Sequence, residues 1–356
     1  MLLEEKIQEN ILLSPYTTLG IGGLARYFVN ASDEQTIFDA VTWAKKQQLP
    51  LFVLGGGSNL VIADSGFPGL VLQINNQKIE SHSQDGKVLV TIAAGQVWDD
   101  FVALSVKNNW QGIECLSGIP GKVGATPIQN VGAYGQEVKD TIVKLDAYDR
   151  ELEKIVSFSN SECQFGYRQS YFKSIAKDRY IILKVTYSLT LSNIPIIHYP
   201  ELQKHLLENT SNPNLSDARE VVLRLRHSKA MVVDPQEPNS KSVGSFFMNP
   251  IIEEEKLQII KEKLLRENFN GSIPEFRATT GKVKLSAAWL IERAGFNKGY
   301  KKGNVAISSK HALALVNQNN GTAKEICLLA EEIQEKVKER FDISLEPEPI
   351  YVGFNK

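Results

Sequence analysis

Five glycines lie within the segment from Ser117 to Val138, SGIPGKVGATPIQNVGAYGQEV, and they constrain the fold of this chain more than any other feature. They stand at 118, 121, 124, 132 and 135, among small apolar residues and the two amides Gln129 and Asn130. Glycine is favoured where the backbone takes φ > 0 or approaches another surface closely. A run of such positions with few charges suits backbone N–H groups laid against phosphates or a flat polar ring. Composition alone equally allows a set of tight turns between short strands.

A second glycine element precedes this segment, from Leu51 to Ala63, with the sequence LFVLGGGSNLVIA. Its pattern predicts a strand, a glycine turn and a strand, and together the two elements favour a ligand site over simple turns. The G-x-G at 55–57 is not a dinucleotide fingerprint, because Leu60 occupies the sixth position and no helical pattern follows. Val123 follows Gly121-Lys122, so the phosphate loop is disfavoured too. Backbone amides of the two segments could still hold a nucleotide.

Length and composition narrow the class of protein. The chain has 356 residues, enough for two or three domains, and its formal net charge of −1 provides no basic footprint for nucleic acid. No apolar run approaches a membrane span, and the N-terminus carries acids where a secretory signal would carry a basic region, so we expect a cytoplasmic protein. The three scattered cysteines and five separated histidines predict neither disulfides nor a metal site.

The first 70 residues predict a small α/β domain. Ser32 and Gln35 indicate a capping box for an amphipathic helix that ends before Pro50, and strands are expected around Phe52 and over 70–74. The middle of the chain is richer in strands, which we expect at 88–94, 141–148, 152–155 and 180–187, with a helix from Trp98 to Asn108. The polar stretches 209–216 and 233–242 are expected to be loops.

The last third predicts a further α/β domain. Helical periodicity covers 253–267, 286–294 and 322–341, and strand-like segments lie at 305–307 and 312–317. We therefore predict an α+β chain with boundaries at 1–70, 71–215 and 216–344, in which the C-terminal strand 345–356 joins the second part.

Three short motifs contain residues that could act chemically. In GYRQSYFK, Arg168 stands between aromatics that would shield a guanidinium for bidentate capture of a carboxylate, although a surface arginine stacked on Tyr167 or Tyr171 is the more common arrangement. In GSFFMNP, Ser245 precedes two phenylalanines, so a partly dry hydroxyl could protonate a carbanion, although turn or cap serines are more common.

The third motif is LEPEPI, in which Glu348 stands between two prolines. An apolar pocket there would raise the pKa of this carboxyl toward that of a useful acid. The simpler interpretation is an exposed charge on a proline-rich edge strand. Each motif alone is therefore weak support for a function.

Taken together, the motifs resemble those of one family, the bacterial UDP-N-acetylenolpyruvoylglucosamine reductases, called MurB. The resemblance runs from about Thr17 to the C-terminus and includes the loop Ile197-His-Tyr-Pro-Glu-Leu202, which is similar to that of the family's first subtype. The motifs, in family order, are Thr18–Gly23, LGGGSNLV at 54–61, the glycine segment at 117–138, GYRQSYFK at 166–173, GSFFMNP at 244–250, Lys284–Ile291 and LEPEPIYVG at 345–353.

This resemblance implies an FAD-binding fold of the PCMH type with two subdomains, followed by a C-terminal substrate-binding domain. It implies that NADPH reduces a non-covalent FAD, and that hydride then passes from flavin N5 to the enolpyruvyl ether of UDP-N-acetylglucosamine, giving UDP-N-acetylmuramate for peptidoglycan synthesis. Arg168 and Glu348 match the residues that hold and polarise the substrate carboxylate, and Ser245 matches the proton donor. Tyr199, Lys229 and Asn249 match candidates for the UDP end of the substrate.

The flavin is expected to lie between the two glycine segments rather than in a Rossmann crevice. The sequence leaves the oligomeric state open, with a monomer favoured, and we expect neither nucleic acid nor a membrane as partner. The cofactor-binding residues implied by the resemblance are Leu54, Gly55, Gly56, Gly57, Ser58, Asn59, Ser117, Gly118, Ile119, Pro120, Gly121, Gly124, Ala125, Gln129, Asn130, Gly132, Ala133, Tyr134 and Gly135.

The sequence departs from the family pattern at two places. Met248 stands where a lysine is common, and the segment after Lys229 is longer than in the best-known members. Both departures bear on nucleotide binding and leave the catalytic set intact. Two other functions stay open: a PCMH-type sugar or alcohol oxidase, which would consume oxygen, and a non-enzymatic nucleotide-binding protein, which would not turn over NADPH.

Overall fold

The computed structural model describes residues 3–208, 210–278 and 280–354. Contacts between residues divide the chain into two compact units. The first runs to Leu12 and includes 24–57 and 67–232, and the second takes 13–23 and 58–66 and continues from Val233. The glycine turn at 55–59 is therefore divided between the units after Gly57.

A four-stranded sheet opens the first unit, in the order β1 (Gln8–Leu12), β2 (Leu24–Ala31), β5 (Phe67–Ile74) and β3 (Leu51–Leu54). Strand β1 is antiparallel to β2, whereas β5 is parallel to both of its neighbours. Helix α2 (Glu34–Lys46) buries Ile37, Ala40 and Val41, as its period predicts. The short α1 spans Leu3–Lys6.

The predicted start of α2 is wrong by one residue. Its N-cap is Asp33, whose carboxylate accepts a hydrogen bond from the Thr36 amide at 2.7 Å. Both Ser32 and Asp33 are good N-cap residues, so the sequence left two neighbouring starts, and the Asp33 carboxylate additionally favours the positive end of the helix.

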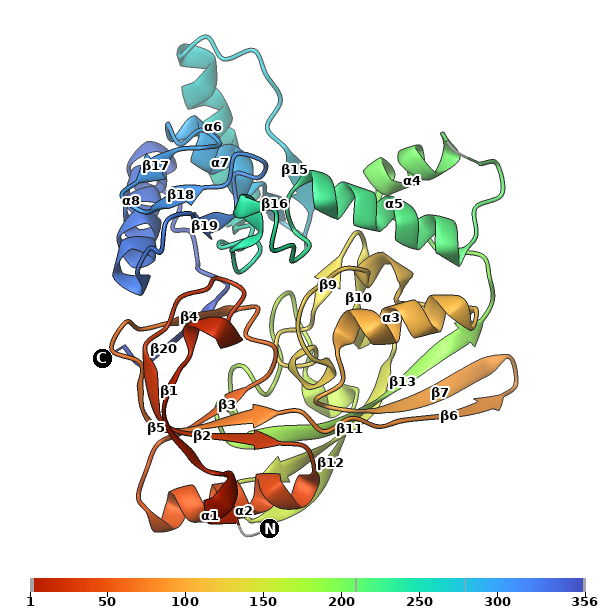
Figure 1. The fold of residues 1–356 in the computed structure, drawn as a ribbon. Coiled ribbons are helices and arrows are strands. Elements are labelled where there is room, and N and C mark those ends of the chain that lie inside the picture. The colour runs from red at the N-terminus through yellow and green to blue at the C-terminus, as the bar shows by residue number, and fades with distance from the viewer. Residues whose placement is uncertain (1–2, 209, 279, 355–356) are drawn as a thin grey trace. The chain divides into compact units, whose positions relative to one another are not determined.

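A larger antiparallel sheet forms the rest of the strand structure in this unit (Figure 1). Helix α3 (Trp98–Lys107), predicted from its period, covers it through Trp98 and Phe101, which pack with Tyr187 in the core. The strand predicted at 152–155 is wrong, because the chain turns at 150–153 and the strand begins at Lys154. The strand order is β12 (Lys154–Ser159), β11 (Ile142–Asp149), β13 (Tyr180–Leu191), β7 (Lys87–Ala93) and β6 (Ile79–Gln84), with β8 (Trp110–Gln111) on β13.

Two helices in the first unit were not predicted, α4 (Pro200–Leu207) and α5 (Leu215–Ser228). Helix α5 begins at a capping box in which Asn214 and Asp217 exchange side-chain and backbone hydrogen bonds. The two helices pack on each other and on Cys115 through small apolar side chains. The short strands β9 (Gly132–Ala133) and β10 (Gln136–Glu137) form a hairpin within the glycine segment.

The second unit has a separate hydrophobic core. Strand β4 (Leu60–Ile62), directly after the glycine turn, pairs in parallel with β20 (Ile350–Val352), the strand that follows Glu348. The strand predicted at 312–317 starts only at Leu315. The other elements are β14 (Ile251–Glu253), β16 (Lys282–Leu285) and β15 (Glu275–Arg277) in one sheet, β17 (Lys301–Lys302), β18 (Val305–Ile307) and β19 (Leu315–Asn317) in another, and helices α6 (Glu254–Arg266), α7 (Ala287–Arg293) and α8 (Ala323–Phe341).

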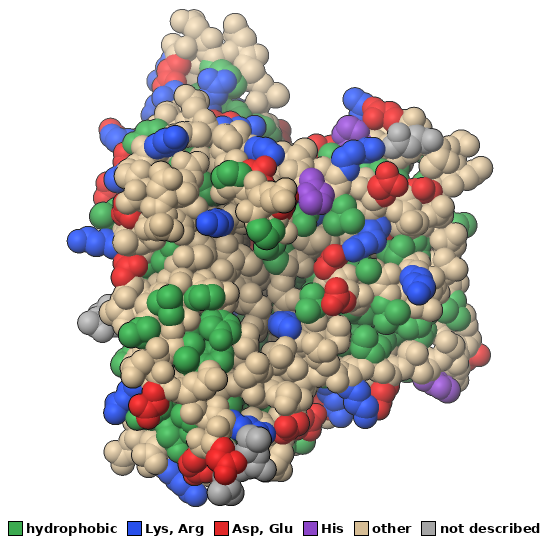
Figure 2. Space-filling model, in the orientation of Figure 1, with side chains coloured by type: hydrophobic (Ala, Val, Ile, Leu, Met, Phe, Trp, Pro, Cys, Tyr) green, Lys and Arg blue, Asp and Glu red, His purple; other side chains and the backbone are tan. Residues whose placement is uncertain are grey.

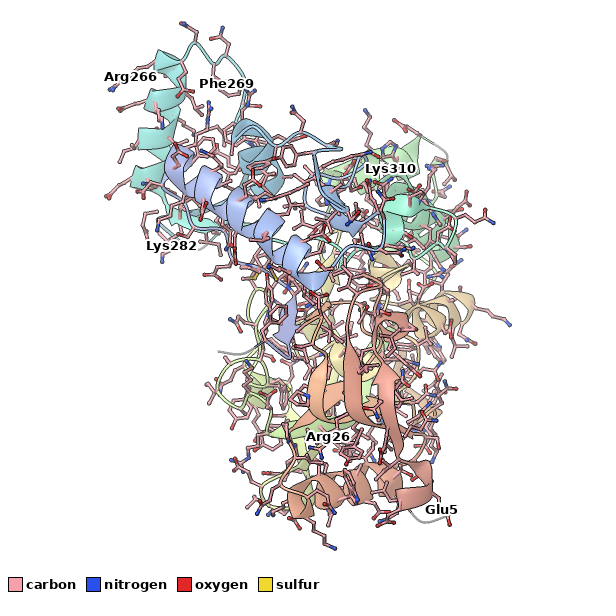
Figure 3. All side chains as sticks on the ribbon, turned by 60° about the vertical axis from the view of Figure 1, so that its left-hand side comes forward. Glu5, Arg26, Arg266, Phe269, Lys282 and Lys310 are labelled. Atoms are coloured by element: carbon pink, nitrogen blue, oxygen red, sulfur yellow. The ribbon has the colours of Figure 1, made fainter. Side chains whose placement is uncertain are left out.

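Helix α6 ends at Arg266, and Phe269 follows it in the chain (Figure 3). The Arg293 guanidinium lies 4.0 Å from the Phe269 ring centroid.

Short 3₁₀ turns complete the secondary structure. The 3₁₀ turns are η1 (Ser14–Tyr16), η2 (Glu114–Leu116), η3 (Val123–Ala125), η4 (Val138–Asp140), η5 (Ser161–Cys163) and η6 (Pro238–Ser240).

The boundary between the two units falls at 232–233 and not near 215, and strand β20 belongs to the second unit. The division into three domains stays a prediction. In the visible face of Figure 2, lysines and arginines are interspersed with aspartates and glutamates, in keeping with a formal net charge of −1. Among the residues that the structure describes, no helix combines the length and apolar character needed to cross a membrane.

Candidate functional site

The two glycine segments of the first unit touch through their backbones. A Cβ added at Gly56 would lie 2.6 Å from the Gly121 Cα atom, so position 56 has no room for a side chain. Gly55 lies beside Lys122 and Ala125, and Gly124 donates its N–H to the Ala94 carbonyl at 2.9 Å. The sequence predicted a close backbone approach at glycines, and the structure shows that these two segments provide it to each other.

This contact predicts a specific effect of one methyl group. We expect Gly56→Ala to lower the free energy of unfolding by about 2 kcal/mol, because the new Cβ would overlap backbone atoms that cannot rotate away. Urea unfolding of the purified protein measures this. Gly55→Ala is the matched control, because the nearest atom to its Cβ is 3.7 Å away. Equal stability of the two variants would contradict the account.

Several groups in the rest of the 117–135 segment already have partners within the protein. The Ser117 hydroxyl is buried and donates to the Glu114 carbonyl at 2.6 Å, and the Gly118 N–H donates to an Asp99 carboxylate oxygen at 2.6 Å. Ile119 and Ala133 pack against the hydrophobic core. Several of the predicted cofactor residues therefore shape the segment rather than present free polar groups.

Asn130 is the clearest example of such a shaping residue. It is fully buried, and its amide donates to the Gly166 carbonyl and to a Glu137 carboxylate oxygen, each at 2.9 Å. Its side-chain oxygen accepts the Lys139 N–H at 3.2 Å. In the structure the Asn130 side chain therefore holds the glycine segment to the motif that contains Arg168.

Two further hydrogen bonds join the Arg168 motif to the glycine segment. The Arg168 guanidinium donates to the Gly132 carbonyl at 2.7 Å, and the Ser170 hydroxyl donates to the Ile128 carbonyl at 2.5 Å. A Cβ on Gly132 would lie 3.3 Å from the guanidinium, so glycine makes room for it. The structure therefore brings together two motifs that lie about thirty residues apart in the sequence.

Arg168 also has an unusual backbone conformation. Its φ is +55°, in the left-handed region that non-glycine residues rarely occupy, and its guanidinium lies 5.5 Å from the Tyr167 ring centroid. The Lys173 ammonium donates to its carbonyl at 3.0 Å. The stacking on Tyr167 was the simpler interpretation of the sequence, and it occurs together with a strained, half-buried position of the kind found at functional sites.

Candidates for the UDP end form a cluster in the first unit. Tyr199 precedes α4 and meets Tyr134 edge-on, with ring centroids 5.5 Å apart. The Lys229 ammonium, at the end of α5, lies 6.0 Å from the Tyr134 ring and 3.4 Å from a Glu201 carboxylate oxygen. Burial raises the pKa of Tyr134 to about 12 and raises that of Tyr199 as well, so both phenols are hydrogen-bond donors at neutral pH.

Ser245 and Glu348 both belong to the second unit, where backbone hydrogen bonds pair their segments. The Glu348 N–H donates to the Phe246 carbonyl at 2.8 Å, and the Met248 N–H donates to the Glu346 carbonyl at 2.9 Å. Ser245 is half-buried between Gly244 and the buried Phe246. The structure therefore pairs the backbone segments that contain these two candidates, with Phe246, the neighbour of Ser245, opposite Glu348.

Asn59, in the glycine turn, is hydrogen-bonded to the segment that contains Glu348. Its amide donates to the Glu348 carbonyl at 3.2 Å, and its own carbonyl accepts the Ile350 N–H at 3.0 Å. The Asn249 side-chain oxygen accepts the Ala287 N–H at 2.9 Å and thereby helps to begin α7. Met248 is half-buried where the family pattern has a lysine.

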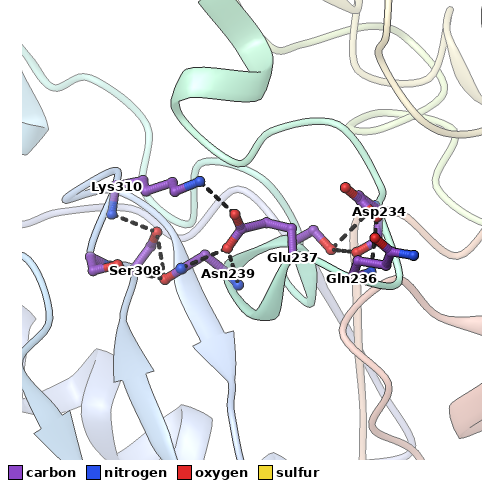
Figure 4. Close-up of polar contacts among 8 residues, drawn as sticks. Asp234, Gln236, Glu237, Asn239, Ser308 and Lys310 are labelled. Carbon is purple, nitrogen blue, oxygen red and sulfur yellow. Dashed lines mark hydrogen bonds and ion pairs between the residues drawn. The ribbon is translucent and has the colours of Figure 1, made fainter.

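The segment after Lys229, longer than the family pattern, contains an ordered polar network (Figure 4). The Lys310 ammonium and both Asn239 N–H groups bind the Glu237 carboxylate, which lowers its pKa to about 2, with Lys310 the largest cause. Asn239 in turn accepts from Ser308 at 3.2 Å. The extra residues are therefore anchored to the turn between β18 and β19.

Asp99 joins three elements of the first unit. It lies in the first turn of α3, accepts the Gly118 N–H, and takes a bidentate contact from Arg219 of α5 at 2.7 and 2.8 Å. Burial opposes its charged form, but the hydrogen bonds from Arg219 and Gly118 and the charge of Arg219 outweigh burial, so its pKa lies below the ordinary value. Asp99 therefore fixes the glycine segment relative to α5.

We expect Asp99→Asn to lower the free energy of unfolding by about 2 kcal/mol at pH 7, since it removes charged hydrogen bonds. Because the folded-state pKa is lowered, the contribution is present above the unfolded value of about 4 and is lost as pH falls through the folded value. The difference between variant and wild type should therefore shrink below about pH 4 in urea titrations. Asp100→Asn, at an exposed neighbour, is the control. A constant difference down to pH 2.5 would contradict the assignment.

The structure can be tested for its fit to a flavin nucleotide. The first unit presents two glycine segments with no side chains at their contact, the hairpin β9–β10, and the tyrosine cluster beside Gly135, whose Cβ would lie 3.2 Å from His198. Such backbone surfaces suit a planar ring and phosphates, so the residues present fit FAD. In the described parts of the chain, no group of three or more His, Cys, Asp or Glu side chains could hold a metal ion.

Several residues at this site were missed from the sequence. Lys122 is half-buried next to Gly55 and donates to Asn75 at 3.2 Å, and burial lowers its pKa. Asp99 lies in a predicted helix, but no local pattern shows that its partners are Gly118 and Arg219. Arg219 and Arg226 lie on α5, a helix that was not predicted at all. The capping box at Asn214 was the available signal.

Comparison with known families agrees with this geometry. Residues 25–159 match a family described as FAD binding domain, and residues 235–352 match a family described as UDP-N-acetylenolpyruvoylglucosamine reductase, C-terminal domain. The predicted fold class, an α+β chain in which a PCMH-type FAD-binding fold precedes a C-terminal domain, is confirmed.

Individual relatives extend over nearly the whole chain. The chain is 43% identical over 349 residues to the UDP-N-acetylenolpyruvoylglucosamine reductase of Thermobifida fusca (strain YX), covering 97% of each. It is 43% identical to that of Streptomyces coelicolor (strain ATCC BAA-471 / A3(2) / M145), covering 98% of this chain and 91% of the relative. The crystal structure of the reductase from Thermus caldophilus matches its fold with a TM-score of 0.65 at 24% identity, covering 96% of this chain and 97% of that one.

Proposed function

Because this chain belongs to the family of UDP-N-acetylenolpyruvoylglucosamine reductases, we propose that it reduces the enolpyruvyl ether of UDP-N-acetylglucosamine to UDP-N-acetylmuramate with NADPH as electron donor. The observation that carries the proposal is the backbone pairing of the Ser245 and Glu348 segments, which brings the segment of a proton donor and the segment of an acid together. When bound, FAD would supply the hydride chemistry between the electron donor and the substrate's methylene carbon.

We propose that the protein's own residues prepare the substrate for this transfer. An enol ether accepts hydride poorly, so its carboxylate must carry the developing negative charge. Arg168, with a planar guanidinium already oriented by Gly132 and Tyr167, holds that carboxylate, and Glu348 in its acid form polarises it. Once hydride has reached the methylene carbon, the Ser245 hydroxyl donates its proton to the adjacent carbon.

The Tyr134, Tyr199 and Lys229 cluster is proposed to bind the UDP end of the substrate. Two protonated phenols and an ammonium offer donors to phosphate oxygens, and Tyr199 supports assignment to the subtype that has the tyrosine-bearing loop. Asn249 contributes less in this proposal, since its side-chain oxygen is committed to α7. The buried, free thiols Cys115 and Cys163 suit the reducing cytoplasm, where we place the reaction.

Isotope labelling and product analysis test this proposal. The purified protein, NADPH and the enolpyruvyl UDP-sugar should give a product heavier by two hydrogens. In D₂O, deuterium should appear at the carbon next to the new methyl group, because the Ser245 hydroxyl exchanges with solvent. The hydrogen that enters the methyl group passes through the exchangeable N–H of reduced flavin N5, so in D₂O that position should also take up deuterium to the extent that this N–H exchanges. Consumption of oxygen with a reduced sugar instead would favour the oxidase alternative, and NADPH oxidation that does not depend on the UDP-sugar would contradict the reductase.

A further inference from the structure

Arg226 is a half-buried cation with incomplete partners. It lies in the last turn of α5, where one guanidinium N–H donates to the Met231 carbonyl at 2.7 Å. Its Nε atom is buried and has no hydrogen-bond partner among the described residues. Leaving a buried donor unpaired is unfavourable, and more so when the group is charged, so such a donor calls for a partner from outside the chain.

The surroundings of Arg226 compensate its charge only partly, through the charge of Asp99. The nearby carboxylate, Asp99, is already taken by Arg219 in a bidentate contact. Within the described part of the chain, no aspartate or glutamate forms an ion pair with Arg226. Burial lowers the pKa of the Arg226 guanidinium, and arginine keeps its proton in proteins. A partly desolvated charge of this kind favours an anion as partner.

The Arg226 Nε lies directly against the glycine segment. A Cβ on Gly118, whose φ is +71°, would be 3.3 Å from this atom and 2.8 Å from a Leu223 methyl group. Glycine at 118 therefore lets α5 approach the backbone of 117–121 and leaves the guanidinium beside it. Tyr134 lies close enough to Arg226 for the charge of the guanidinium to lower the pKa of its phenol, against the larger effect of burial. Lys229 follows Arg226 by three residues at the end of α5, and its ammonium lies 6.0 Å from the Tyr134 ring.

We infer that Arg226 binds a phosphate oxygen of a nucleotide diphosphate next to Gly118. The inference rests on the proposed function and adds a residue to it. A guanidinium fork matches a phosphate better than a single donor does, and Lys229 and the Tyr134 phenol offer further donors to the same anion. Two nucleotides share this chemistry, the flavin cofactor with its diphosphate and the UDP moiety of the substrate.

Binding measurements on Arg226→Gln separate these two sources. The full chain freed of flavin is titrated with FAD and, separately, with riboflavin, which has the same ring system and no phosphate, and the reconstituted protein is titrated with UDP. If Arg226 binds the cofactor diphosphate, the Kd for FAD rises at least tenfold and that for riboflavin stays within twofold. If it binds the UDP moiety, only the Kd for UDP rises at least tenfold.

Arg224→Gln is the matched control, because Arg224 is exposed two residues earlier on the same helix, and it should behave as wild type. An Arg226→Gln protein that binds FAD and UDP as wild type does would overturn the inference, and so would an equal loss for FAD and riboflavin, which indicates a purely structural role. If the Arg226→Gln variant does not fold, the inference is tested on the wild-type protein. Millimolar inorganic pyrophosphate should raise the melting temperature of the flavin-free chain. An unchanged melting temperature would overturn the inference. Failure of wild type to bind FAD would contradict the proposed function itself.

Discussion

Replacing Ser245 with alanine is expected to leave reduction of the flavin by NADPH nearly unchanged and to slow the reoxidation by the enolpyruvyl UDP-sugar about 10²–10⁴-fold. The proposed role of the hydroxyl is to donate a proton to one carbon of the substrate, and that step occurs only in the second half-reaction. Removing one oxygen from a half-buried position next to Phe246 costs little packing, so the variant should fold. Stopped-flow absorbance of the two half-reactions separates the effects.

Ser245→Cys is the informative partner variant, since a thiol keeps a proton to donate and should retain part of the rate. If Ser245→Ala instead slows both half-reactions equally, Ser245 supports the local structure and not the proton transfer. A second half-reaction at the wild-type rate would remove Ser245 from the mechanism.

Replacing Arg168 with lysine is expected to lower kcat/KM at least 10²-fold, equivalent to about 2.7 kcal/mol of transition-state stabilisation. An ammonium retains the charge but cannot copy the two parallel N–H groups that would hold a carboxylate. The guanidinium is oriented in advance by the Gly132 carbonyl and the Tyr167 ring, and lysine loses both orienting contacts. The measurement is steady-state NADPH oxidation at varied substrate concentration.

Arg26→Lys is a close control for this variant. Arg26 is exposed and lies 5.2 Å from the ring of its neighbour Tyr27, as Arg168 lies over Tyr167, so stacking on an adjacent tyrosine is common to both. Only Arg168 is expected to affect turnover. Near-normal kcat/KM for Arg168→Lys would mean that its stacking is structural and that another group holds the carboxylate.

Local patterns predicted much of the fold where amphipathic periodicity was strong. Helices α3, α6, α7 and α8 lie within one residue of their predicted spans, because each has a continuous apolar face. Helix α5 was missed although its apolar residues follow the same period. The turn-rich stretch 209–216, expected to be a loop, extends over the first residues of this helix, and no helix was predicted after it.

The site was only partly predictable, for a different reason. The motifs identified which residues matter, since glycine segments, an arginine among aromatics and a glutamate between prolines are local features. Which motifs meet depends on hydrogen bonds across long sequence separations, such as Asn130 with Gly166 or Glu348 with Phe246, and no local pattern encodes these. For the same reason the sequence could not show that Gly118 is held by Asp99 and approached by Arg226.

The most direct test of the central claim is a two-stage anaerobic experiment on the purified, flavin-loaded protein. NADPH is added first while the visible flavin absorption is followed, and the enolpyruvyl UDP-sugar is added after the absorption has bleached. We expect bleaching in the first stage and full recovery of the yellow colour in the second. Bleaching without recovery would contradict this substrate, and a well-folded protein that binds no FAD would contradict the whole account.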